Sequence, residues 1–245
     1  MIGIFINVGA VILGGILGTL FGKKMTPEFT AEMNKVFGIS AMCMGISTIA
    51  NMKNMPAVVL AVILGTAIGL VCKLNLRISQ CGELMQKPAD KLMGNFSGNG
   101  SMTRDEYLSL LVTTVVLFCS SSTGIYGCLD AGMTGSSTIL VSKAVLDAFT
   151  AMVFACNLGI VVSVVAVPQT IVYLIMFFAA KLILPLTTPE MIGDFKACGG
   201  FLLVATGLRV SKVKEFPIAD MIPAMIIVMP LSAMWTNLIA PLLGG

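Results

Sequence analysis

A lysine and an aspartate lie four residues apart in an apolar stretch of this sequence. Lys143 and Asp147 both fall within the run Ile139–Cys156, and side chains at i and i+4 of a helix lie on one face and can pair. If the run crosses a membrane, each charge at its centre costs about 2.5–3.5 kcal/mol, so both must face protein or water. The pair either fixes the register of buried helices, or lines a path where it binds a solute or carries a proton. Proton carriage requires the pair to separate, because a carboxylate beside an ammonium keeps its proton poorly.

Further polar side chains lie near this pair in the sequence. Ser136, Thr150 and Asn157 fall on the same face of the expected helix, at about 100° per residue. Four hydroxyl side chains also follow directly on the apolar run Leu108–Cys119: Ser120, Ser121, Ser122 and Thr123. With Gly124 they favour a break in the helix, with hydroxyls facing the interior. We expect Thr150, Asn157, the hydroxyls and the charged pair to line a substrate or ion pathway.

The composition indicates that lipid is the solvent of this chain. Of its 245 residues, 57% are hydrophobic and 11% are charged, and the mean hydropathy is +0.98. Soluble domains carry about 25% charged residues. Apolar runs, six long and two shorter, lie near 4–21, 36–50, 57–72, 107–120, 139–156, 168–186, 197–208 and 218–240. The sequence therefore predicts an all-α polytopic membrane protein with about eight membrane segments, six or seven being alternatives.

Two parts of the chain carry the same marker residues at the same spacing. Thr-Pro-Glu at 26–28 is followed by Gly38 and Gly45, and Thr-Pro-Glu at 188–190 is followed by Gly200 and Gly207. Basic residues cluster before the short apolar run in the first copy and after it in the second. Because basic loops face the cytoplasm, the two copies are predicted to cross the membrane in opposite directions. This is an inverted-topology repeat of three helices around a central helix pair.

The repeat and one long polar stretch divide the chain into four predicted segments. Residues 1–75 form the first three-helix repeat, 76–106 a polar cytoplasmic link, 107–160 the central helix pair with its broken serine-rich segment, and 161–245 the second, inverted repeat. The same charge rule places both termini outside and the link Lys73–Arg104 in the cytoplasm. We expect a multi-pass protein of the bacterial inner (plasma) membrane.

Short helices at matching positions of an inverted repeat indicate the central site of a transporter. Each copy has a short apolar run of about 15 residues, which spans about 22 Å as a helix against a hydrocarbon core of about 30 Å. Its glycines, together with Thr206, are predicted to line the pathway: Gly38, Gly45, Gly200 and Gly207. The alternative is that these glycines only let helices pack closely.

Other chemistry has weaker support in the sequence. Histidine is absent and the seven cysteines form no C-x-x-C pair, so we expect no metal and no cofactor. Nucleic-acid binding would require a basic face, and the sequence has none, so we expect no nucleic-acid partner. A Ser–Lys pair of Ser120–Ser122 with Lys143 would suit acyl transfer, but no nucleophile elbow accompanies it, and we expect no enzyme. Glycines at 14, 18 and 22, and at 65 and 69, predict close helix contacts within the chain or in a homo-oligomer.

Three stretches of the sequence resemble one family of bacterial membrane proteins. They are LFCSSSTGIYGCLDAGMTGSSTILVSKAVLDAFTAMVFACNLGIVVSV, LPLTTPEMIGDFKACGGFLLVATGLR and FINVGAVILGGILGTLFG. They resemble the YqgA/YdfK-type family, and the similarity covers nearly the whole chain outside the Lys73–Arg104 link. The resemblance implies a polytopic inner-membrane protein and no catalytic residues, because the family has no known function. An acidic residue commonly follows the Gly-Met-Thr-Gly loop in that family. This chain has Ser136 there, which weakens any requirement for a carboxylate.

Together these features predict a transporter. Alternating access around the central helix pair would move a small polar or charged solute: an ion, an organic anion or a zwitterion. The sequence selects none of these. The expected partners are the lipid bilayer and this solute. The alternatives are an ion or solute channel, which would use the same polar face without two states, an intramembrane enzyme, and a structural or regulatory subunit with no pathway.

Overall fold

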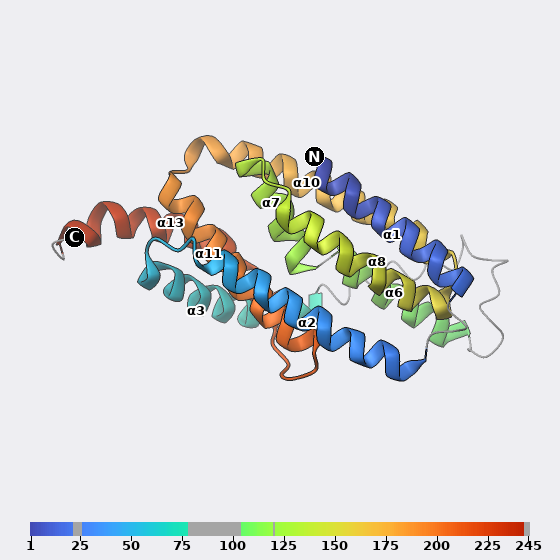
Figure 1. Ribbon diagram of the computed structural model, residues 1–245. Coiled ribbons are helices and arrows are strands. Elements are labelled where there is room, and N and C mark those ends of the chain that lie inside the picture. The colour runs from blue at the N-terminus through green and yellow to red at the C-terminus, as the bar shows by residue number, and fades with distance from the viewer. Residues whose placement is uncertain (22–25, 78–103, 120, 243–245) are drawn as a thin grey trace. The chain divides into compact units, whose positions relative to one another are not determined.

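The computed structural model describes residues 1–21, 26–77, 104–119 and 121–242, which form helices joined by turns, with no strand among them (Figure 1). Six helical stretches in this part of the chain are long and apolar enough to cross a membrane: Ile2–Phe21, Met55–Cys72, Thr138–Leu158, Val161–Leu186, Pro189–Val210 and Ile218–Leu242. The predicted all-α polytopic membrane fold is confirmed, because the length and composition of these helices match a bilayer. The number of full crossings and the repeat stay predictions. Most of the predicted link, residues 78–103, lies outside the described residues.

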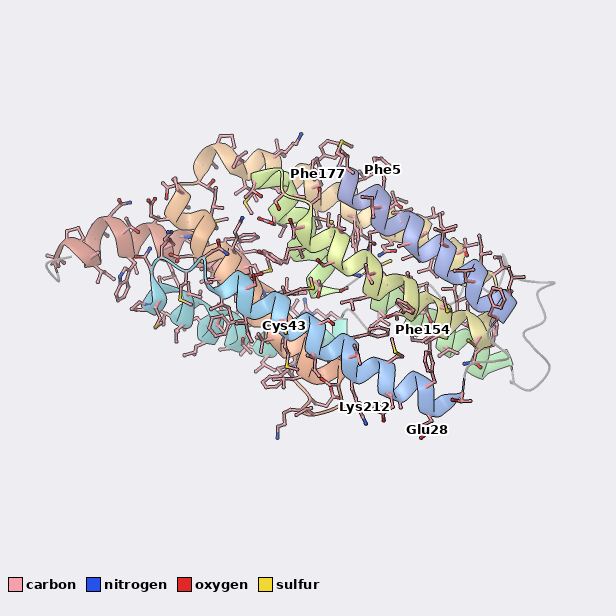
Figure 2. The ribbon with its side chains drawn as sticks, viewed as in Figure 1. Phe5, Glu28, Cys43, Phe154, Phe177 and Lys212 are labelled. Atoms are coloured by element: carbon pink, nitrogen blue, oxygen red, sulfur yellow. The ribbon has the colours of Figure 1, made fainter. Side chains whose placement is uncertain are left out.

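The helices form two compact units, which we describe separately. Unit 1 consists of residues Met1–Glu32 and Leu76–Ala179. Its helices are α1 (Ile2–Phe21), α6 (Arg104–Cys119), α7 (Ser122–Thr134), α8 (Thr138–Leu158), α9 (Val161–Val164) and most of α10 (Ala166–Ile183). In Figure 1, α1 runs alongside α8, and these two helices share the most extensive contact of the described pairs. Ile4 of α1 and Phe177 of α10 belong to one buried apolar cluster, at the end of the unit where Figure 2 labels Phe5 and Phe177.

Small residues bring α1 and α8 into close contact. Gly14 and Gly18 of α1 lie against the backbone of α8, and a Cβ added to Gly18 would lie 2.8 Å from Ala155 Cβ. A Cβ added to Gly14 would overlap the carbonyl oxygen of Ala148. Small residues four apart allow this approach in membrane helices. The predicted glycine contact is therefore made within the chain at these positions, and Gly22 lies outside the described residues.

Two glycines of α1 give a matched test of this packing. Gly14→Ala is expected to destabilise the folded protein by about 1–3 kcal/mol, because the added methyl group overlaps backbone that must shift. In the control, Gly9→Ala, no described atom lies within 4 Å of the added Cβ. Alanine is also more favourable than glycine inside a helix, by about 0.5–1 kcal/mol. Thermal unfolding in detergent should show a lower melting temperature for the first variant only, and equal losses in both would contradict the close contact.

Unit 2 consists of residues Met33–Asn75 and Ala180–Gly245, of which the structure describes those up to Leu242. Its elements are α2 (Pro27–Ile49, from Met33 onward), α3 (Met55–Cys72), η2 (Leu184–Leu186), α11 (Pro189–Val210), α12 (Ile218–Met221), α13 (Pro223–Met234), η3 (Trp235–Ile239) and α14 (Ala240–Leu242). α11 begins after Thr188, whose Oγ1 accepts from the backbone N–H of Met191 at 3.3 Å, as an N-cap does. α13 packs against both α3 and α11.

α2 and α11 meet through two reciprocal glycine contacts. A Cβ added to Gly45 would lie 2.7 Å from the carbonyl oxygen of Gly200, and one added to Gly200 would lie 2.7 Å from that of Gly45. Gly38 and Gly207 face each other in the same way, so the two helices run antiparallel. An inverted repeat would produce this exchange of equivalent positions.

The expectation of short helices at these positions is wrong. α2 has 23 residues and α11 has 22, because the polar residues before each apolar run are helical as well. α11 is long and apolar enough to span a membrane, so a helix too short to cross the hydrocarbon core no longer supports a central site here. In this structure the four glycines of the repeat pack helix against helix.

The predicted break after the apolar run is present. α6 ends at Cys119 and α7 begins at Ser122, with Ser121 extended at φ −61° and ψ 121°. Ser120 and the side chain of Ser122 lie outside the described residues. Gly124 is inside α7 rather than at the break, and a Cβ added to it would overlap the hydroxyl group of Tyr173. This glycine therefore makes room for a side chain from α10.

Candidate functional site

Five polar side chains from three helices meet inside unit 1, and we call them the buried polar cluster. They are Asn7 of α1, Lys143 and Asp147 of α8, and Gln169 and Tyr173 of α10. Asn7, Gln169 and Tyr173 are fully buried, and Lys143 and Asp147 are 3% and 7% exposed. Burial of polar groups costs free energy unless they are hydrogen-bonded. The stability of the cluster therefore depends on its internal bonds.

The carboxylate of Asp147 is the centre of the cluster. Its Oδ2 accepts from the Lys143 ammonium, from Asn7 Nδ2 at 2.9 Å and from Gln169 Nε2 at 3.3 Å. The i, i+4 pair of Lys143 and Asp147 therefore forms, and it is buried. Three donors, one of them charged, offset the loss of water around the carboxylate. The pair is neutral as a whole and is held by side chains of α1, α8 and α10.

The amide group of Gln169 has one fixed orientation. Its Nε2 lies 2.9 Å from Asn7 Oδ1, 3.3 Å from Asp147 Oδ2 and 3.1 Å from the Tyr173 hydroxyl oxygen. These neighbours require a donor at this position, because an amide oxygen there would face the acceptors of Asn7 and Asp147. Oε1 is then a buried acceptor with no hydrogen-bond partner among the described residues. Such an atom costs about 1–3 kcal/mol unless something donates to it or binds it.

The broken helix brings the end of α6 to the cluster. The Tyr173 hydroxyl donates to the carbonyl oxygen of Phe118 at 3.3 Å, in the last turn of α6, where carbonyl groups lack helical partners. The Lys143 ammonium lies 6.0 Å from the ring centroids of both Phe118 and Tyr173, within the range of cation–π attraction. The C-terminal end of a helix carries partial negative charge. The break at Ser121 thus places a negative helix end beside the buried ion pair.

The polar face predicted on α8 is shorter than its sequence spacing suggests. Among the described contacts, only Lys143 and Asp147 take part in the cluster. Thr150 donates to the carbonyl oxygen of Leu146 at 2.9 Å, one turn back in the same helix. Asn157 is exposed and lies about 15 Å beyond Asp147 along the helix axis. Pathway roles for Thr150 and Asn157 stay predictions.

The remaining predicted pathway residues divide between the two units. In unit 1, Thr123 is buried in the first turn of α7 and Ser121 is half-buried at the break. In unit 2, the hydroxyl of Thr206 donates to the carbonyl oxygen of Leu202 at 2.7 Å, and the four glycines of the repeat join α2 to α11. Their part in a pathway is likewise still a prediction.

Three members of the cluster are absent from the residues predicted above. Asn7 and Gln169 each stand alone in a long apolar run, and Tyr173 follows Gln169 by one turn. An isolated amide in a membrane helix usually faces protein rather than lipid, and this signal could have identified both amides. The partner of each amide comes from a helix far away in the sequence, which no local pattern predicts.

Unit 2 contains a second buried carboxylate that the sequence analysis did not single out. Asp194 of α11 is fully buried. Its Oδ1 accepts from the backbone N–H groups of Lys53 and Asn54, both at 2.8 Å. Its Oδ2 accepts from Asn54 Nδ2 at 2.9 Å and from Ser232 Oγ at 2.7 Å. Asp194 therefore caps the N-terminal end of α3, where the helix dipole favours negative charge.

Three residues beyond the opposite end of α3, the backbone is also bonded to a buried carboxylate. Asp220 of α12 accepts from the backbone N–H of Asn75 at 3.0 Å. Gly69 of α3 lies against the backbone of Asp220, and Gly65 lies against Ala224 of α13. These glycine contacts, like those of α1, are made within the chain. No group of three or more His, Cys, Asp or Glu side chains in the described parts of the chain could hold a metal ion.

The similarity to known proteins extends over nearly the whole chain. The chain is 43% identical over 240 residues to the uncharacterized protein YqgA of Escherichia coli (strain K12), covering 96% of this chain and 98% of YqgA. It is 26% identical over 235 residues to the uncharacterized membrane protein YdfK of Bacillus subtilis (strain 168), covering 93% of each. No solved structure matches the chain. A model of the family described as protein of unknown function (DUF554) matches residues 2–233. The resemblance found in the sequence is confirmed, and the chain belongs to the DUF554 family.

Proposed function

We propose that this multi-pass membrane protein carries a small polar or charged solute across the bacterial inner membrane, with the buried polar cluster as its binding site. The observation that carries the proposal is the ion pair of Lys143 and Asp147, buried and bonded to side chains of two further helices. Ionisable groups inside apolar helix bundles are costly and usually mark a substrate or ion path. A purely structural pair would not need the unpaired acceptor of Gln169 beside it.

The burial of the cluster favours a carrier over a channel. No member is more than 7% exposed, so a solute reaches the pair only when the helices around it move. The extended residue Ser121 between α6 and α7 is a position where such movement would not break helical hydrogen bonds. The reciprocal contacts of α2 and α11 support an inverted repeat, and inverted repeats are typical of carriers with alternating access.

The proposal includes the arrangement in the membrane and the partners. Both termini lie outside and the link Lys73–Arg104 lies in the cytoplasm, since basic loops stay on that side. The partners are the lipid bilayer and the solute, with neither nucleic acid nor a catalysed reaction. Because the described Gly-x-x-x-Gly contacts are made within the chain, a homo-oligomer would associate through other faces.

Flux into liposomes tests the proposal. Protein reconstituted into liposomes should take up at least one of radiolabelled sodium, succinate or glycine, which represent an ion, an organic anion and a zwitterion. Lys143→Ala and the charge-neutral double variant Lys143→Ala/Asp147→Ala should lose at least about 90% of that uptake, whereas the exposed-lysine control Lys214→Ala should keep it.

The outcomes separate the alternatives. Uptake that is unchanged in well-folded variants of the pair would refute the cluster as the site. A conductance that persists in gel-phase lipid, where carriers stop, would indicate the channel instead. Uptake of none of the three solute classes would favour a structural or regulatory subunit.

A further inference from the structure

We infer that the buried polar cluster binds a small monovalent cation, and that the cation takes the place of the proton on Lys143. This inference rests on the proposed function, because it names the class of solute at the same site. It follows from the atoms around the ammonium of Lys143. They are a carboxylate and two aromatic rings, at the carbonyl end of a helix. The amide group of Gln169, whose nitrogen is bonded to the same carboxylate, adds a buried oxygen without a partner among the described residues.

The buried polar cluster supplies oxygen ligands for a cation. Small hard cations bind carboxylate and carbonyl oxygens. Gln169 Oε1 is fully buried and unpartnered within the described structure, and its amide nitrogen is bonded to the Asp147 carboxylate. Asp147 Oδ2 accepts from Lys143, Asn7 and Gln169, so Oδ1 of the same carboxylate is available for a cation on the described contacts. The cluster suits an anion less well, because its only charged donor, Lys143, is already bonded to the Asp147 carboxylate.

The electrostatic field at the buried polar cluster favours positive charge. α6 ends beside the cluster, and the negative end of a helix dipole attracts cations. The rings of Phe118 and Tyr173 both lie 6.0 Å from Lys143 Nζ, and aromatic faces attract positive charge as well. Broken helices in carriers commonly turn their C-terminal carbonyl ends to a coupling cation. In this structure the Lys143 ammonium is the cation that these groups stabilise.

The exchange conserves charge. In one state Lys143 is an ammonium paired with the Asp147 carboxylate. In the other, a monovalent cation is bound to Asp147 and Gln169 Oε1, and Lys143 is a neutral amine. One proton leaves the Lys143 nitrogen for water as one cation enters, and no bond other than this N–H is broken. The cluster is therefore neutral in both states, so neither leaves a net charge in a low-dielectric interior.

Other titratable groups near the pair are few. On α10, Tyr173 is bonded to Gln169, and the thiols of Cys119 on α6 and Cys128 on α7 lie within electrostatic range of Lys143. Asp130 of α7 is bonded to Thr134. α1 and α9 bring no ionisable side chain. Lys143 is the one ammonium in contact with Asp147 among the described residues, so we assign the exchanged proton to it.

Proton release from the purified full-length protein tests this inference without any transport. The protein in detergent and a weak buffer, with a pH-indicator dye, is titrated with the chlorides of sodium, potassium, lithium and methylammonium, and with choline chloride as the ionic-strength control. At least one of the four small cations should release close to one proton per chain, with saturation. The apparent affinity should rise about tenfold per pH unit, because one proton is exchanged for each cation bound.

Substitutions test which side chains release the proton and which bind the cation. Lys143→Arg, whose guanidinium cannot lose its proton, should release no proton and should bind the cation at least tenfold more weakly, seen as a smaller rise in melting temperature. Gln169→Leu, which removes Oε1, should weaken binding at least tenfold, and Asp147→Asn should abolish it, whereas Lys214→Ala should behave as wild type. Absence of proton release with all four cations, or release that persists in Lys143→Arg, would overturn the inference. Solute uptake with no cation effect would refute this inference alone. Cation-dependent proton release without any uptake would refute the proposed transport alone.

Discussion

Asp147→Ala is expected to destabilise the folded protein by about 3–5 kcal/mol, because it leaves the ammonium of Lys143 buried with no carboxylate partner. Lys143 is 3% exposed, so water does not replace the lost partner in this structure. The substitution also removes the acceptor for Asn7 Nδ2 and Gln169 Nε2. Reversible unfolding of the purified protein in mixed detergent, followed by circular dichroism, measures this loss as a lower midpoint.

The matched control removes both charges. Lys143→Met/Asp147→Leu replaces the pair by apolar side chains of similar size, and such replacements of buried pairs are often neutral or stabilising by about 1–4 kcal/mol. We therefore expect the double variant to recover most of the stability lost in the single variant, while solute uptake stays absent. A double variant as unstable as Asp147→Ala would show that the lost stability does not come from the unpaired ammonium.

Asp194→Ala is expected to destabilise unit 2 by about 2–4 kcal/mol, since it leaves donors of Lys53, Asn54 and Ser232 without their acceptor. Asp194→Asn should cost less, because an amide oxygen can still accept from the two backbone N–H groups. Hydrogen exchange at the amides of Lys53 and Asn54 should become faster in Asp194→Ala, and the melting temperature should fall.

The control for this prediction is Glu190→Ala, one turn earlier on α11. It also removes an acidic side chain near the start of the helix, where the helix dipole attracts negative charge and water screens the attraction. Its effect should therefore be clearly smaller than that of Asp194→Ala. Equal effects of the two variants would mean that the helix dipole, and not the cap on α3, accounts for the role of Asp194.

The sequence predicts those features of this protein that depend on local composition. The membrane class follows from the apolar runs, and the helix break follows from hydroxyl residues at 120–123. The contact between Lys143 and Asp147 follows from helix geometry alone. Each of these features depends on residues that are close together in the chain, so a local pattern is enough to predict it.

The features that the sequence analysis predicts wrongly or misses depend on contacts between residues far apart in the chain. The segment before the apolar run 197–208 contains Glu190, Asp194 and Lys196, and the expected short helix leaves it out. α11 nevertheless includes it, because Asp194 is satisfied by donors from another part of the chain. In the same way, Asn7 and Gln169 bond to each other across a separation of 162 residues. The sequence around Asp194, Asn7 or Gln169 does not indicate which distant residue bonds to it.

The hydrogen bonds made by the residues on either side of α3 limit how unit 2 can move. A slide of α3 along α13 by one helical turn, about 5.4 Å, would break the bonds to Asp194 and to Asp220 at the same time. Sliding of packed helices past one another is therefore disfavoured in this unit. We expect α3, α11 and α12 to keep their mutual spacing through any cycle of the protein, so that distances between spin labels on these three helices stay constant when a solute binds.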